Sequence, residues 1–189
     1  MKVTELALPG VLFIEPRHFM DGRGYFLETY QERRYGDFDI PARFVQDNLS
    51  FSRHGVVRGL HYQLHQPQGK LVMVLQGEVF DVVVDIRLGS PTFGVAASKV
   101  LSAAGHHQLY VPPGYAHGFV VLSDAALFHY KCTDYYNPGD EYGIRWNDPD
   151  LGIAWPVAEA VLSDRDRHFP LLRDAPPEHL PIYHQPLSP

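Results

Sequence analysis

Residues 55–63 read Gly-Val-Val-Arg-Gly-Leu-His-Tyr-Gln, and residues 69–87 read Gly-Lys-Leu-Val-Met-Val-Leu-Gln-Gly-Glu-Val-Phe-Asp-Val-Val-Val-Asp-Ile-Arg. Short apolar runs between glycines predict three consecutive β-strands here. Arg58, His61 and Lys70 stand among these apolar neighbours, where a cation must lose its hydration and finds few partners. We therefore interpret this stretch as part of a site that meets something anionic or reactive.

The segments around this stretch repeat the pattern of short apolar runs separated by Gly, Pro, Ser and Asp. Few windows show a helical period, and the best candidate for a short helix is 31–36. Regular short strands without intervening helices indicate an antiparallel sandwich or barrel, and within this all-β class we predict a jelly roll with a few short helices. The predicted strands are 11–14, 25–30, 56–62, 70–75, 79–86, 94–101, 107–111, 116–122 and 127–133.

The chain has 189 residues, a length that suits one domain with a full core. We predict a single domain over 1–173, followed by a Pro-rich tail, 174–189, that packs lightly or not at all. The Asp and Asn within 44–48 predict the end of a strand and a turn. The polar cluster at 162–166 predicts a loop or a helical turn.

The composition argues against several classes of partner. The net charge is −6, whereas nucleic-acid-binding domains carry a basic excess on one face, so we expect no nucleic-acid partner. The single cysteine, Cys132, has no partner for an internal disulfide, and its neighbours indicate a buried strand. The apolar runs are too short for a signal peptide or for the roughly 18 residues of a membrane span, so we expect a cytoplasmic protein without membrane contact.

Histidines in a jelly roll raise the question of a metal site of the cupin type. That site uses His-x-His, then a Glu separated by six residues from a Gly, then Pro-x-Gly-x-x-His. Here Gln63 replaces the second His, Lys70 occupies the Glu position, and only His61 and His117 remain. An ammonium has no lone pair for a metal. We therefore predict no metal, and instead a cation that stabilises negative charge on a carbonyl oxygen.

A base and an acid can be chosen from the same strands. His61 can take a proton near neutral pH, because the unperturbed pKa of histidine is about 6.5. A carboxylate on its other ring nitrogen, from Asp166 or Asp85, would fix the tautomer. Tyr130 shares a strand face with Phe128 by alternation, and its hydroxyl is a candidate acid. Base, cation and acid together predict proton abstraction beside a ketone with reprotonation from the other side, which is epimerisation.

Eight runs of residues, spread over nearly the whole chain up to about residue 170, are specific enough to suggest a family. They are Asp-Gly-Arg-Gly-Tyr-Phe at 21–26, Phe-Val-Gln-Asp-Asn at 44–48, Val-Val-Arg-Gly-Leu-His-Tyr-Gln at 56–63, Gln-Gly-Lys-Leu-Val at 68–72, Gly-Glu-Val-Phe-Asp-Val at 77–82, Ser-Pro-Thr-Phe-Gly at 90–94, Pro-Pro-Gly-Tyr-Ala-His-Gly-Phe at 112–119 and Ile-Arg-Trp-Asn-Asp-Pro at 144–149. With them the chain resembles the nucleotide-sugar 3,5-epimerases, above all the dTDP-4-dehydrorhamnose 3,5-epimerase family.

The resemblance implies a metal-independent jelly-roll homodimer that needs no cofactor and acts on a dTDP-linked 4-keto-6-deoxyhexose. In dTDP-4-dehydro-6-deoxy-D-glucose the C4 keto group acidifies the protons at C3 and C5, and inversion at both carbons gives dTDP-4-dehydro-L-rhamnose. On the same resemblance His61 would be the base, with Asp166 as its carboxylate partner. Tyr130 would be the acid on the opposite face, and Lys70 would hold the enolate oxygen.

The resemblance also assigns substrate contacts. Arginine offers a fork geometry to phosphate, so a net acidic chain can bind an anionic substrate through local charge. Arg165 stands where many relatives have Lys, and it keeps the charge. The implied contacts are Arg23, Arg58 and Arg165 with the diphosphate or sugar, Glu28, Gln46, Asp47 and Asn48 with the nucleotide or the neighbouring chain, Tyr136 stacked on the thymine, and His117 and Glu141 completing the pocket.

Three alternatives stay open on the residues alone. Some members of the family invert only C3 or only C5 in antibiotic deoxysugar pathways, and they keep the same base and acid. A metal-dependent cupin oxygenase or isomerase would bind iron or manganese. A non-catalytic sugar-binding jelly roll would need neither His61 nor Tyr130 for proton transfer, so substituting those two residues separates it from an enzyme.

Overall fold

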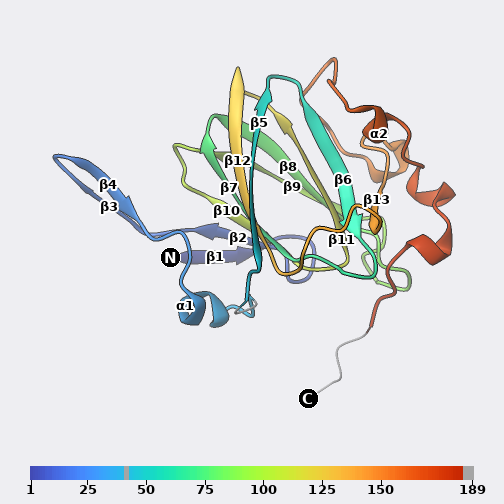
Figure 1. Cartoon of the computed structure of the whole chain (residues 1–189), viewed down its shortest axis with the longest axis horizontal. Helices are drawn as coiled ribbons and strands as arrows, with labels where there is room; N and C mark the ends of the chain where they lie inside the picture. Colours follow the sequence, from blue (N-terminus) through green and yellow to red (C-terminus); the bar gives the residue numbers. More distant parts are fainter. Residues whose placement is uncertain (41–42, 185–189) are drawn as a thin grey trace.

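Two antiparallel sheets face each other in the computed structural model, which describes residues 1–40 and 43–184 (Figure 1). The first sheet has six strands in the order β1-β2-β10-β7-β12-β5, and the second has five in the order β13-β6-β11-β8-β9. Strands distant in the sequence are neighbours within both sheets, which is typical of a jelly roll. The predicted all-β sandwich is therefore confirmed.

A two-stranded hairpin, β3 and β4, belongs to neither sheet and extends away from the sandwich (Figure 1). We call it the arm. The strands are short, as the spacing of the apolar runs predicts. Their bounds are β1 Lys2–Glu5, β2 Leu12–Glu15, β3 His18–Asp21, β4 Gly24–Leu27, β5 Gln46–Arg53, β6 Val57–Gln63, β7 Lys70–Gln76, β8 Glu78–Asp85, β9 Ala96–Ser102, β10 Gln108–Val111, β11 Tyr115–Val121, β12 Ala125–Cys132 and β13 Glu141–Gly143.

Helices are few and short. The predicted helix at 31–36 is α1 (Glu32–Gly36), which begins where the Gln31 side chain accepts a hydrogen bond from the backbone of Arg34. The polar cluster near 162–166 forms α2 (Asp164–Arg167). The described residues also contain three 3₁₀ helices elsewhere: η1 Pro149–Leu151, η2 Leu172–Asp174 and η3 Pro177–His179. Within the described part of the chain, no helix is both long and apolar enough to cross a membrane.

The core between the sheets is built from inward-facing side chains of the central strands. Val72 of β7, Val83 of β8 and Phe119 of β11 belong to one buried cluster. Phe119 and Phe128 of β12 stack with ring centroids 4.2 Å apart, which joins the two sheets. Burial of each such side chain contributes roughly 1.5–3 kcal/mol. The core thereby holds β6, β11 and β12 in fixed positions beside the cavity described below.

A register shift on β6 decides which side chains reach the space between the sheets. His117 on β11 pairs with His61, but Phe119 pairs with Arg58, so three steps along β6 match two steps along β11. Without such a bulge, residues three apart on a strand point to opposite faces. Gly59 lies in the bulge with a φ of +127°, and a Cβ there would come 2.5 Å from the backbone of β11. The bulge brings Arg58 and His61 to the same cavity.

The C-terminal segment differs from the prediction of a lightly packed tail. Ala175 and Leu180 are buried in a second core cluster, and the backbone N–H of Tyr183 donates to the Leu88 carbonyl oxygen at 2.9 Å. Their apolar side chains and the bridge to residue 88 hold 174–184 on the domain. Light packing is therefore wrong for this part, and the remaining residues of the expected tail, 185–189, lie outside the described residues.

The prediction of a strand end and turn at 44–48 is also wrong. The strand β5 begins at Gln46 and continues to Arg53, paired with β12 along its whole length. The strand tolerates Asp47 and Asn48 because successive side chains point to opposite faces of the sheet, where each finds polar neighbours. Asn48 lines the cavity, whereas Asp47 faces outward and binds the Lys131 ammonium at 2.8 Å.

Candidate active site

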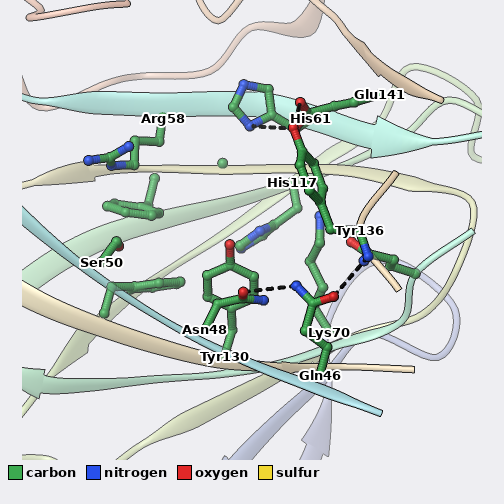
Figure 2. A pocket seen from close by; sticks show the side chains of 14 residues that line it. Gln46, Asn48, Ser50, Arg58, His61, Lys70, His117, Tyr130, Tyr136 and Glu141 are labelled. Atoms are coloured by element: carbon green, nitrogen blue, oxygen red, sulfur yellow. Dashed lines mark hydrogen bonds and ion pairs between the residues drawn. The ribbon is translucent and has the colours of Figure 1, made fainter. Parts of the chain in front are cut away.

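A cavity of about 350 Å³ opens between the two sheets (Figure 2). Its walls come from strands β5 and β12 on one side and β6 and β11 on the other, so residues far apart in sequence meet there. The lining residues are Gln46, Asn48, Ser50, Arg58, His61, Gln68, Lys70, His117, Gly118, Phe119, Phe128, Tyr130, Tyr136 and Glu141.

His61 is held by a carboxylate from helix α2. Its Nε2 lies 2.5 Å from Oδ1 of Asp166, which is buried. Ser163 caps this helix by accepting a hydrogen bond from the Asp166 backbone N–H at 3.1 Å, which fixes the position of the carboxylate. Asp85, the other candidate partner, instead accepts hydrogen bonds from Arg87 and from two hydroxyls. Asp166 is therefore the residue that can fix the tautomer of His61.

A second histidine–carboxylate pair lies on the same wall. His117 Nε2 is 2.8 Å and 3.0 Å from the two carboxylate oxygens of Asp81 on β8. Burial raises the pKa of Asp81, although the neighbouring His117 and Lys70 work in the opposite direction. Asp81 was not among the predicted site residues, and its only signal in the sequence is an acidic residue within the apolar run of residues 79–84. The pair fixes the orientation of the His117 ring beside the cavity.

Lys70 enters the cavity at the start of β7. Burial lowers the pKa of its ammonium, while the negative charges of Glu141 and Asp81 partly offset this effect. Among the described residues, no carboxylate lies within ion-pair distance of its Nζ atom. A dehydrated ammonium of this kind interacts strongly with negative charge that develops on a ligand oxygen.

Tyr130 stands on the opposite wall from His61. It projects from β12 of the six-stranded sheet, whereas His61 projects from β6 of the five-stranded sheet (Figure 2). Burial raises the pKa of Tyr130 to about 12, so its phenol carries a proton at neutral pH. The predicted alternation on this strand is confirmed, because Phe128 lines the cavity with Tyr130 while His129 faces the outside of the sheet. An imidazole and a protonated phenol thus flank one chamber.

Polar side chains at one end of the cavity form a connected chain. The backbone N–H of Tyr136 donates to Gln46 Oε1 at 2.9 Å, and Gln46 Nε2 donates to Asn48 Oδ1 at 2.9 Å. The Tyr136 hydroxyl donates to Glu141 Oε2 at 2.9 Å, and Arg165 of α2 also binds this carboxylate. The structure therefore brings together most of the predicted substrate contacts, with amides, a ring and a guanidinium in one place.

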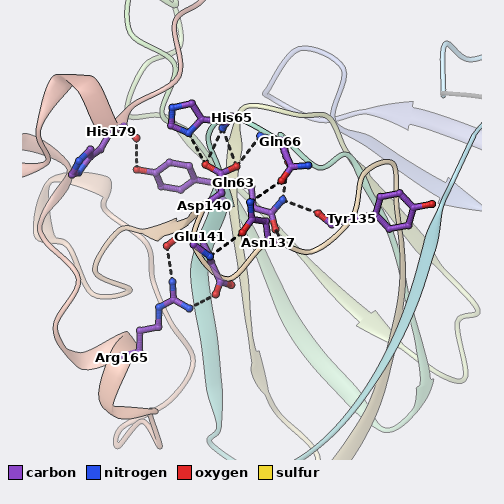
Figure 3. Close-up of polar contacts among 11 residues, drawn as sticks. Gln63, His65, Gln66, Tyr135, Asn137, Asp140, Glu141, Arg165 and His179 are labelled. Carbon is purple, nitrogen blue, oxygen red and sulfur yellow. Dashed lines mark hydrogen bonds and ion pairs between the residues drawn. The ribbon is translucent and has the colours of Figure 1, made fainter.

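The loop that carries Tyr136 is fastened to the loop after β6 by a network of polar contacts (Figure 3). Asp140 accepts hydrogen bonds from the backbone N–H groups of His65 and Gln66 at 3.0 Å and 2.7 Å. Burial acts to raise the pKa of Asp140, but these hydrogen bonds hold it below its ordinary value. The backbone N–H of Asn137 donates to Gln63 Oε1 at 2.9 Å. The network fixes one rim of the cavity.

Five predicted site residues do not line the cavity of their own chain. Asp166 and Arg165 lie behind it and bind the lining residues His61 and Glu141, whereas the other three lie away from it. Arg23 lies at the turn of the arm and binds Asp21 at 2.6 Å. Glu28 lies just after the arm and binds Arg34 at 2.6 Å. Asp47 faces the outside of the six-stranded sheet, as described above.

Several lining residues were not predicted. Ser50 follows Asn48 by two positions on β5, so alternation alone indicates that both face inward. Phe119 and Phe128 resemble ordinary core residues in the sequence, and only the pairing of strands shows that they also border a cavity. In the part of the chain that the structure describes, no group of three or more His, Cys, Asp and Glu residues is arranged to hold a metal ion.

Comparisons with known proteins agree with this geometry. Residues 5–174 match the family model described as dTDP-4-dehydrorhamnose 3,5-epimerase. The enzyme of that name from Pseudomonas aeruginosa is 52% identical over 177 residues, covering 93% of this chain and 98% of its own. A dTDP-4-dehydrorhamnose 3-epimerase from Streptomyces niveus is 40% identical over 177 residues, covering 93% of this chain and 86% of its own.

Among solved structures, a dTDP-6-deoxy-D-glucose-3,5-epimerase from Legionella pneumophila, in complex with dTDP-4-keto-L-rhamnose, superposes with a TM-score of 0.95. It is 49% identical in sequence, and the match covers 97% of this chain and 99% of that one. A dTDP-4-dehydrorhamnose 3,5-epimerase from Elizabethkingia anophelis has a TM-score of 0.88 at 46% identity, covering 92% and 97% of the two chains. The likeness therefore extends over the sandwich and the cavity together.

Proposed function

This chain belongs to the dTDP-4-dehydrorhamnose 3,5-epimerase family, and we propose that its cavity converts dTDP-4-dehydro-6-deoxy-D-glucose into dTDP-4-dehydro-L-rhamnose. It is an isomerase that inverts C3 and C5 of a 4-keto sugar. The observation that carries the proposal is the placement of His61, backed by Asp166, on one wall and of Tyr130 on the other. Inversion needs a base and an acid on opposite faces of one ring.

The first half of each inversion is proton abstraction by His61. The C–H bond next to the ketone breaks, its electron pair moves into the C4 carbonyl as an enolate, and an N–H bond forms on the imidazole. Asp166 at 2.5 Å stabilises the imidazolium that results. Lys70 stabilises the enolate oxygen, because its partly dehydrated charge meets negative charge that exists only during the reaction.

The second half is reprotonation by Tyr130. Its O–H bond breaks and leaves a phenolate, the C=C pair of the enolate forms a C–H bond on the opposite face of the same carbon, and the pair on the enolate oxygen restores the C=O bond. The high pKa of Tyr130 keeps the proton available at neutral pH, and the enolate that receives it is strongly basic. After His61 has released its proton and Tyr130 has regained one, both by exchange with solvent, the same sequence at the second carbon completes the double inversion.

The nucleotide and diphosphate occupy the rest of the cavity. Tyr136 offers a ring for stacking on the thymine, and Gln46 and Asn48 offer amide groups beside it. Arg58 and Arg165 supply the positive charge for the diphosphate or the sugar, although Arg165 is bound to Glu141 in this structure. His117, held by Asp81, completes the pocket.

A homodimer would give Arg23, Glu28 and Asp47 a place in or near a site, although they lie away from the cavity of their own chain. The outer face of β5 and β7 and the arm expose large apolar side chains, as interaction surfaces do: Leu49, Phe51, Leu75, Phe19, Met20, Tyr25 and Phe26. In the proposed dimer these surfaces cover each other, and Arg23 and Glu28 reach the cavity of the second protomer, with Asp47 at the interface. Light scattering tests the dimer. Mixing Arg23→Ala chains with His61→Ala chains should restore part of the activity, and no restoration would contradict the shared site.

The decisive experiment follows solvent deuterium by NMR while the protein acts on dTDP-4-dehydro-6-deoxy-D-glucose. Incorporation at both C3 and C5 supports the double epimerase, whereas incorporation at one carbon alone would contradict it. The variant Tyr130→Phe should lose product by about 10²–10⁴-fold, the usual contribution of an acid–base group. The expected cytoplasmic location stays a prediction that cell fractionation can check.

A further inference from the structure

His61 lies between two carboxylates, and only one of them has a place in the mechanism above. Asp166 occupies Nε2 at 2.5 Å, which leaves Nδ1 as the nitrogen that can take a proton from a ligand. Oε1 of Glu141 lies 3.9 Å from this Nδ1 (Figure 2). A side-chain rotation that moves either atom by about an ångström would bring the two atoms within hydrogen-bond distance.

The Glu141 carboxylate is anchored through its other oxygen. Oε2 accepts a hydrogen bond from the Tyr136 hydroxyl at 2.9 Å. It also binds Arg165, whose Nη2 donates to the Glu141 backbone carbonyl oxygen at 2.6 Å (Figure 3). Strand β13 lies next to β6, with Glu141 opposite Gln63. The anchoring leaves Oε1 directed toward His61.

The two carboxylates also differ in their access to water. The Asp166 side chain is 5% exposed and the Glu141 side chain is 16% exposed, so only the second has an appreciable contact with solvent. Each inversion leaves one proton on His61 and removes one from Tyr130. His61 must therefore release a proton before it can act on the second carbon. Its side chain is 26% exposed, but the ring edge that carries Nδ1 is the one that faces the ligand, and Asp166 on the other edge is buried, so Glu141 is the neighbouring group with a route to water while the ligand is bound.

We propose that Glu141 is the relay that passes the proton from His61 to solvent between the two inversions. In this step the Nδ1–H bond breaks and an O–H bond forms on Oε1, after which the proton moves from the carboxyl group to a water molecule. The reverse path reloads His61 from solvent. The inference rests on the proposed epimerase function and adds a role that substrate binding by Glu141 alone does not include.

The test is the fate of the abstracted proton in D₂O. An excess of the unaltered chain is mixed with dTDP-4-dehydro-6-deoxy-D-glucose for a single turnover. NMR then measures the deuterium in recovered substrate and, as product, the amount of sugar inverted at one or both carbons, because the first inversion needs no proton release from His61. With the relay in place, recovered substrate gains deuterium through His61. In Glu141→Gln the ratio of this deuterium to product should fall roughly a hundredfold, the lower end of what positioned acid–base groups contribute.

Each other result has a defined meaning. If the ratio of deuterium to product does not change in Glu141→Gln, whether both quantities fall equally or neither falls, Glu141 only holds the ligand and the relay is overturned. If the unaltered chain forms product without deuterium in recovered substrate, the relay is also overturned. If the unaltered chain neither exchanges nor inverts, the proposed function itself fails.

Two further variants keep the test interpretable. Glu159→Gln removes an exposed carboxylate that does not line the cavity, and it should leave the ratio unchanged. Glu141→Asp keeps the negative charge but shortens the side chain by one methylene, so it should lower the ratio by less than Glu141→Gln. If Glu141→Gln does not fold, a ratio in Glu141→Asp equal to that of the unaltered chain overturns the relay.

Discussion

His61 and His117 are partners across strands β6 and β11, and each is paired with a carboxylate. The His61 side chain is 26% exposed and its partner Asp166 comes from the short helix α2. The His117 side chain is 7% exposed, and its partner Asp81 is completely buried within β8. We infer from this contrast that a neighbouring carboxylate is not sufficient to make a histidine a base. Exposure to the ligand and to water decides which pair can take up and release protons.

The largest effect should come from breaking the exposed pair at the histidine itself. We expect His61→Ala to slow deuterium exchange at C3 and C5 by about 10²–10⁴-fold, because the other histidine on that wall, His117, is only 7% exposed and is paired with the buried Asp81. His117→Ala should act mainly on KM. Calorimetry should find near-native affinity of His61→Ala for dTDP, since the nucleotide contacts lie elsewhere. Complete loss of dTDP binding would mean that His61 holds the fold or the ligand.

The negative charge of Asp81 acts on the ammonium of Lys70. A substitution of Lys70 therefore tests whether the buried pair of His117 and Asp81 supports a group that takes part in the reaction. We expect Lys70→Met to lower kcat by about 10²–10³-fold, the usual cost of removing one stabiliser of an oxyanion. The same change should make the folded protein more stable at neutral pH, because a dehydrated ammonium opposes folding. A variant with unchanged kcat would exclude Lys70 from the reaction.

The stability of the unaltered chain should also depend on pH because of Lys70. Burial lowers its pKa in the folded state below the ordinary value of 10.5, so the unfolded chain binds more protons between the two values. The free energy of unfolding should therefore rise with pH across this window, and the advantage of Lys70→Met should shrink as pH approaches 10.5. Urea unfolding at a series of pH values measures both slopes. Parallel slopes would show that Lys70 is not dehydrated.

A smaller and more selective effect should follow from replacing the two carboxylates in turn. Asp166→Asn removes the group that orients His61 and stabilises its charged form, so kcat should fall roughly 10- to 100-fold, as for other residues that orient a functional imidazole. Asp81→Asn should change kcat less but lower the free energy of unfolding by about 1–3 kcal/mol, since it disturbs a buried hydrogen-bonded pair. The opposite order of effects on kcat would make His117 the base.

The architecture and the type of chemistry could be predicted from the sequence, because both depend on local patterns. Alternation and glycine spacing located most strands, and the residue types of His61, Lys70 and Tyr130 indicated a base, a cation and an acid. These residues do line one cavity. Their roles stay predictions until the substitutions above are made.

The remaining features depend on long-range pairing, which no local pattern contains. Asp81 reads as one acidic residue in an apolar run, and only the register of β8 with β11 places it against His117. The bulge at Gly59 reverses the alternation of β6, so the sequence alone would place Arg58 and His61 on opposite faces. Arg23 lies on the arm, outside the cavity of its own chain, which a motif cannot reveal.

The smallest effect concerns two serines of β5, of which one is hydrogen-bonded and the other is not. Ser52 Oγ accepts a hydrogen bond from Arg58 Nε at 2.9 Å, whereas Ser50 Oγ, two residues earlier on β5, is buried and has no hydrogen-bond partner among the described residues. We expect Ser50→Ala to raise the free energy of unfolding by about 1 kcal/mol, because an unpaired buried hydroxyl opposes folding. Ser52→Ala should lower it, since Arg58 loses its acceptor. Urea unfolding measures both changes. A destabilised Ser50→Ala would show that a water molecule in the cavity binds the Ser50 hydroxyl. In that case both serines are hydrogen-bonded, and the contrast between them is lost.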